Sequence, residues 1–123
     1  MPPLDDIDII NRGIEAGTSA RGVDRATINN ILSVFYGEQD PVKGVILTQI
    51  YIARQGRRRE ITEEVVRVMM RHIKEIYDSF KGDSESLKRA MDLYFLSMKW
   101  SFESEVPRSG NVDEFVSKVL GGR

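Results

Sequence analysis

The sequence contains no cysteine, one histidine, four prolines and only 8% aromatic residues. Without cysteine the chain holds no disulfide, thiol nucleophile or iron–sulfur cluster, and one histidine is too few for a zinc finger. The N-terminal segment is acidic and has no basic leader-like region. No apolar run approaches the ~18 residues of a membrane-spanning helix. We therefore expect a cytoplasmic protein that makes no contact with a membrane.

An excess of charge of one sign is also missing, because 18 basic and 19 acidic residues leave a net charge of −1. This balance excludes a globally basic nucleic-acid coat. Hydrophobic residues make up 41% of the chain and charged residues 30%, which is the composition of a folded protein. A chain of 123 residues is the size of one domain, so we expect residues 1–123 to form a single domain. Loose tails are expected at 1–4 and 121–123.

Strand-like alternation of apolar and polar residues is absent, whereas apolar residues recur at helical spacing along the whole chain. Helix starts are indicated by Asp40 before Pro41, by Thr62, and by Asn111 with Glu114 three residues later in the form of a capping box. The pattern predicts an all-α fold, a single compact bundle of five or six helices. The expected helices cover about 5–16, 24–36, 41–55, 62–82, 85–105 and 111–120.

Three details of this pattern concern which faces are buried. In the first helix the stripe Leu4, Ile7, Ile10 and Ile14 predicts the inner face, and 17–22 is expected to be a loop. The third helix is apolar nearly all round, so it is either central or has a second buried face against a partner. In the fifth helix Phe95 and Trp100 lie outside the main apolar stripe, which suggests a second buried surface there.

Enzyme chemistry has little support. His72 has no metal-ligand pattern around it, so we expect a histidine at the surface or at the core boundary. Clustered carboxylates stand where helix starts favour them, and no phosphate loop or nucleophile elbow is present. We therefore expect no catalytic residues, no metal site, no cofactor and no enzymatic activity.

Positive charge is concentrated in one segment. Residues 54–74 have a net charge of +4, whereas the other 102 residues have −5. Six of the seven basic residues in this segment are arginines, whose planar guanidinium suits phosphate oxygens. Such a face can hold a nucleic-acid backbone without reading its sequence, although ion pairs with nearby glutamates would make it an ordinary solvated face. The candidate RNA-backbone-binding residues are Arg54, Arg57, Arg58, Arg59, Arg67, Arg71 and Lys74.

Four segments, in this order, resemble the small helical subunit of type III-A CRISPR RNA-guided effector complexes, the Csm-type small subunit. They are Ala26-Thr-Ile-Asn-Asn-Ile-Leu-Ser33, Tyr51-Ile-Ala-Arg-Gln-Gly-Arg57, His72-Ile-Lys-Glu-Ile76 and the aromatic-rich stretch from Ala90 to Met98-Lys99-Trp100. The resemblance spans about residues 26–102. The chain departs from the family at Asn29, where a basic residue is typical, and in its additional last helix.

This resemblance implies a non-catalytic role in antiviral defence, as one subunit of a ribonucleoprotein complex. Its implied partners are guide RNA and target RNA, held by their phosphate backbones, and the other effector-complex subunits, which it bridges. Only Arg54 and Arg57 are implied by the family pattern, and the other basic candidates follow from the charge argument. The alternative is a homo-oligomeric helical adaptor or protein-interaction module without a nucleic-acid role. Self-association is compatible with both hypotheses.

Overall fold

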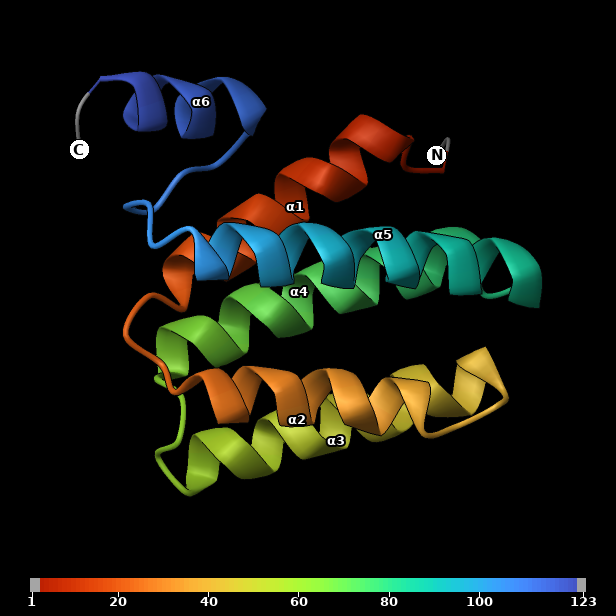
Figure 1. Ribbon diagram of the computed structural model, residues 1–123. Helices are drawn as coiled ribbons and strands as arrows, with labels where there is room; N and C mark the ends of the chain where they lie inside the picture. Colours follow the sequence, from red (N-terminus) through yellow and green to blue (C-terminus); the bar gives the residue numbers. More distant parts are fainter. Residues whose placement is uncertain (1–2, 122–123) are drawn as a thin grey trace.

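A computed structural model describes residues 3–121 (Figure 1). These residues form six helices and no strand, which confirms the predicted all-α fold. The expected tails at 1–4 and 121–123 fall largely on residues 1–2 and 122–123, which lie outside the described residues. The helices are α1 (Asp6–Ser19), α2 (Arg25–Tyr36), α3 (Pro41–Arg57), α4 (Glu63–Phe80), α5 (Ser84–Glu103) and α6 (Val112–Leu120).

Side-chain caps begin the helices where the sequence predicted them. The carboxylate of Asp40 accepts a hydrogen bond from the Val42 amide, and the Thr62 hydroxyl accepts one from the Val65 amide. Asn111 accepts from the Glu114 amide at 2.9 Å and so caps α6 as expected. The capping box there is incomplete, because the Glu114 carboxylate accepts from the amide of Gly110 instead of that of Asn111.

The helices α1 and α5 lie against each other over most of their lengths (Figure 1). Gly13 and Gly17 of α1 permit this close approach, since a methyl group at Gly13 would meet the Tyr94 carbonyl of α5 at 2.8 Å. The prediction of which face of α1 is buried is wrong in part. Ile9 and Ile14 are buried, whereas Ile7 is exposed. The predicted loop at 17–22 also starts too early, because contact with α5 holds residues 17–19 in the helix.

The core lies between α1 to α5 and includes a cluster of aromatic rings. Phe95 packs 5.4 Å from Phe35 and 5.6 Å from Tyr94, measured between ring centroids. Phe95 is thus a core residue, and the prediction that it belongs to a second surface is wrong. Trp100, on the same helix, does face outward and is 63% exposed.

The helices form two groups (Figure 1). An antiparallel pair, α2 and α3, lies on one side of the bundle, and α1, α4 and α5 lie on the other. Helix α3 is therefore peripheral, and its outer face exposes Ile46, Leu47 and Ile50. Helix α6 lies beyond α1, at the edge opposite to α2 and α3. Within residues 3–121 no helix is both long and apolar enough to cross a bilayer.

Candidate nucleic-acid interface

An open groove of about 1120 Å³ occupies one end of the bundle. It lies where the connection between α1 and α2, the end of α3 and the start of α4 come together, on the left in Figure 1. Val23, Ala53 and Val66 contribute apolar surface to its lining. The basic residues that line it are Arg21, Arg57, Arg59 and Arg67, and we call it the arginine groove.

Arg59 lies at this groove in a backbone conformation that usually requires glycine. Its φ is +63°, in the left-handed region. The Arg59 amide donates to the Gly56 carbonyl and the Glu60 amide to the Gln55 carbonyl, which is the Schellman arrangement that ends many helices. Glycine is the usual residue at this position because a side chain is strained there. The chain thus holds an arginine at the groove despite a local conformational cost.

The arginines of the groove are largely unpaired. Among residues 3–121, the side chains of Arg21, Arg57 and Arg59 form no hydrogen bond or ion pair. Arg67 lies 3.9 Å from Glu63, and both side chains are mostly exposed, so this pair contributes little. The groove also contains Asp24, Glu60 and Glu63, so its lining has a net charge of only +1. Its guanidinium groups remain available to an anionic ligand, and its overall field is weak.

The structure places the predicted basic residues in three locations. Arg57, Arg59 and Arg67 line the groove, and Arg54 and Arg58 are exposed beside it without lining it. The remaining two lie farther along α4 and are paired. Arg71 is 3.2 Å from Glu15, and Lys74 Nζ is 2.7 Å from Asp78.

Arg21 is the residue of the groove that the sequence argument missed. It stands in the short connection between α1 and α2, far in sequence from the other arginines. Nothing local distinguishes it from an ordinary surface arginine. Only the packing of α1 against the rest of the bundle brings it to the end of α3.

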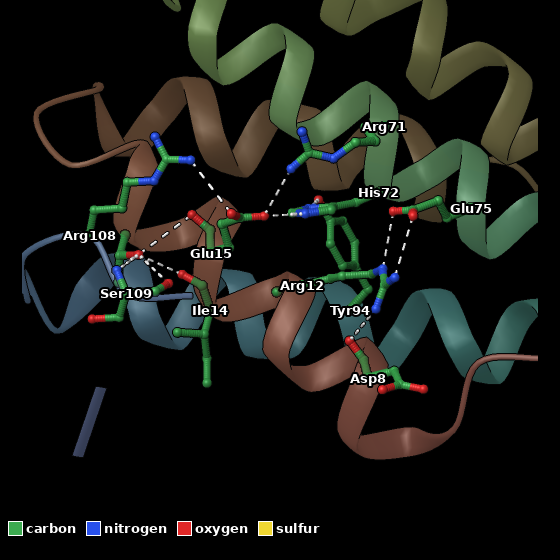
Figure 2. A network of polar contacts seen from close by, with 12 residues as sticks. Asp8, Arg12, Ile14, Glu15, Arg71, His72, Glu75, Tyr94, Arg108 and Ser109 are labelled. Carbon is green, nitrogen blue, oxygen red and sulfur yellow. Dashed lines mark hydrogen bonds and ion pairs between the residues drawn. The ribbon is translucent and has the colours of Figure 1, made fainter. Parts of the chain in front are cut away.

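A second group of polar side chains lies between α1, α4 and α5 (Figure 2). His72 is 2% exposed, so the prediction of a surface or boundary histidine is wrong. Its Nε2 is 2.6 Å from Glu15 Oε1, and its Nδ1 is 3.2 Å from the Tyr94 hydroxyl. Because an ionised carboxylate only accepts, we assign the proton to Nε2 and let Nδ1 accept from Tyr94. Paired polar partners on two neighbouring helices make burial of this histidine tolerable.

His72 and Glu15 in this cluster both have shifted pKa values. Burial lowers the pKa of His72, and its hydrogen bond to Glu15 only partly offsets this effect. Burial raises the pKa of Glu15, but the hydrogen bond from His72 and the charges of His72, Arg71 and Arg108 together bring it below its ordinary value. Around neutral pH the cluster therefore pairs a carboxylate with a neutral imidazole.

Ion pairs surround this cluster on the side that faces solvent. Arg12 donates to both carboxylate oxygens of Glu75, and Arg108 pairs with Glu15 (Figure 2). Arg108 also pairs with Glu64. Arg12, Glu15 and Glu75 line a cavity of about 200 Å³. Since each acidic group already has a basic partner, the arrangement stabilises the junction of α1 with α4. Within residues 3–121 no three His, Cys, Asp or Glu side chains converge as a metal site.

The arginine groove is therefore the site whose charged groups are free to bind a ligand, whereas the His72 cluster is internally paired. Comparison of the chain with known protein families, with curated proteins and with solved structures finds no match.

Proposed function

We propose that this protein binds the phosphate backbone of RNA, without reading its sequence, through the arginine groove. The observation that carries the proposal is Arg59, which keeps a positively charged side chain at the groove in a left-handed backbone conformation. Strained positions of this kind cluster at functional sites. A glycine would end α3 at lower cost, so the side chain is the reason to keep arginine there.

The chemistry of the lining fits a phosphodiester chain. Four guanidinium groups from three separate parts of the chain face one groove, and each offers a planar fork of donors to phosphate oxygens. The aromatic residues that would stack on bases do not line it. Contacts to phosphates without base contacts hold RNA of any sequence.

The resemblance extends this proposal to a biological role. As a Csm-type small subunit, the chain is a non-catalytic component of a CRISPR RNA-guided effector complex. There it clamps the guide and target RNA and bridges other subunits. The weak net charge of the groove supports RNA binding by several subunits together. One such groove gives modest affinity, and several subunits along one RNA add their contacts.

The test measures RNA affinity against salt concentration by fluorescence anisotropy. Because each neutralised phosphate of a single strand contributes ~0.7 to the slope of log K against log salt, Arg57→Ala with Arg59→Ala should flatten the slope by roughly 1.4. The loss should be equal for RNAs of different sequence. Lys43→Ala is the matched control, since it removes a positive charge from the far end of α3. A slope that stays unchanged in the double variant contradicts backbone binding by the groove.

Membership of an effector complex needs a separate measurement. A tagged chain is purified from native cells, and the RNA and proteins that accompany it are identified. Short guide RNAs with a shared repeat-derived 5′ end, together with large effector subunits, support the proposed role. If the co-purified RNA is of random origin and its binding depends on salt, the result supports backbone binding and contradicts the effector role.

A further inference from the structure

Helix α6 has an apolar face that residues 3–121 leave largely uncovered. None of its residues is buried, and Leu120 is 80% exposed. The contacts at its start and end are polar, from the Val112 amide to the Asn11 side chain and from Lys118 to the Arg108 carbonyl. Asp113, Val116 and Leu120 follow at i, i+3 and i+7 and so form one exposed stripe. An amphipathic helix held in this way leaves its apolar stripe exposed to solvent.

Helix α3 has an exposed apolar stripe of its own. Ile46, Leu47 and Ile50 face outward, and Ile50 is 62% exposed. One turn farther along the same face the stripe ends in Arg54, whose side chain makes no ion pair or hydrogen bond among residues 3–121. Apolar residues followed by an unpaired arginine form a surface that suits an apolar helix beginning with an acidic residue.

The two stripes match in spacing when the helices run in opposite directions. Leu47 and Arg54 are seven residues apart, as are Asp113 and Leu120. An antiparallel alignment that sets Asp113 beside Arg54 also sets Leu120 beside Leu47. Val116 then falls opposite position 51, one residue from Ile50. Both spans are about 10 Å at 1.5 Å per residue. Asp113, like Arg54, has no ion pair or hydrogen bond within the described part of the chain.

An α6 that docks on α3 must come from another molecule. Helix α6 lies at the edge of the bundle opposite to α3 (Figure 1). The segment before α6 is tied to α1, because the Ser109 amide donates to Thr18 Oγ1 at 2.9 Å and both residues are buried. Val106 is buried in the same segment. This attachment keeps α6 away from its own α3.

We propose that α6 of one copy docks antiparallel on the outer stripe of α3 of a second copy, and so joins copies head to tail. The contact uses two different surfaces, so each docked molecule leaves a free α6 and a free α3 for the next copy. Helix α6 lies outside residues 26–102, and the proposal is independent of the RNA-binding role. It places Arg54 in a protein contact and leaves the arginine groove open.

Sedimentation of the full-length protein over a range of concentrations tests the proposal. The wild type should form dimers and larger species as its concentration rises. Ile50→Glu and Leu120→Glu should each weaken association at least about tenfold, because a carboxylate then stands in the centre of the apolar contact. Ile7→Glu is the control, since Ile7 is an exposed apolar residue of α1 that lies on neither stripe. Circular dichroism confirms that each variant is folded.

An equimolar mixture of Ile50→Glu and Leu120→Glu gives the decisive result. The first variant keeps a functional α6 and the second a functional α3, so together they should form a dimer that does not grow further. Arg54→Asp should weaken assembly, and Asp113→Arg in the same chain should restore it. A wild type that stays monomeric, a mixture that stays monomeric, or a dimer that neither single variant weakens overturns the proposal.

Discussion

The imidazole Nε2 of His72 lies 2.6 Å from a carboxylate oxygen of Glu15, and this contact joins α4 to α1. The other ring nitrogen faces the Tyr94 hydroxyl of α5, so one buried side chain connects three helices. Buried polar groups stabilise a fold only while their partners are in the right protonation state. The contact therefore makes the stability of the bundle depend on pH.

Acidification should destabilise the protein through His72. Its pKa in the folded protein is below the ordinary value of 6.5, so the unfolded chain binds more protons near that pH. The free energy of unfolding should fall as the pH is lowered from about 7.5 to about 5, and His72→Gln should flatten this dependence. Urea unfolding at several pH values, followed by circular dichroism, measures it. Stability that rises on acidification would mean that Glu15, rather than burial, controls the histidine.

Gly17→Ala should strain the contact between α1 and α5. A methyl group at Gly17 would lie 2.9 Å from the Phe102 amide nitrogen and closer still to Met98 and Ser101, so the two helices must move apart. Overpacking of this kind costs about 1–3 kcal/mol. Chemical denaturation gives the value. Gly82→Ala is the matched control, because nothing lies within 4 Å of a methyl group there, and equal losses in both variants would contradict the close approach.

Arg59→Gly should separate stability from binding. Removing the side chain from a left-handed position should stabilise the protein by about 0.5–1 kcal/mol, and it should also weaken RNA binding. Glu105 has a φ of +54° at the end of α5, so Glu105→Gly should give a similar gain without affecting RNA. Thermal unfolding and RNA titration of both variants test this. An Arg59→Gly protein that binds RNA as well as the wild type removes the functional reason for the strained arginine.

The starts of the helices could be predicted because they depend on neighbours in sequence. Thr62 caps α4 with its own hydroxyl, and Asp40 precedes a proline that fits the first helical position. The buried faces were harder to predict, since they depend on residues distant in the chain. His72 looks like a surface residue until Glu15 and Tyr94 are brought beside it, and Gly17 looks like a helix end until α5 packs on it.

The same limit applies to the candidate site. The local excess of arginine identified Arg57, Arg59 and Arg67, because they follow one another around the connection of α3 with α4. It could not show that Arg71 pairs with Glu15 of the neighbouring α1, nor that Arg21 reaches the groove from the connection between α1 and α2. The periodicity of α3 did indicate an apolar outer face, which the structure leaves uncovered.

Because of the way in which α6 is attached, α6 should open locally without the rest of the bundle. Helices α1 to α5 share one core, so their amide hydrogens should exchange only through large-scale unfolding. Helix α6 contributes no buried side chain, and its amides should exchange far faster than those of α5. At high protein concentration α6 gains protection if another copy covers it. The amide exchange rate of α6 therefore reports whether another copy of the chain is bound to this helix.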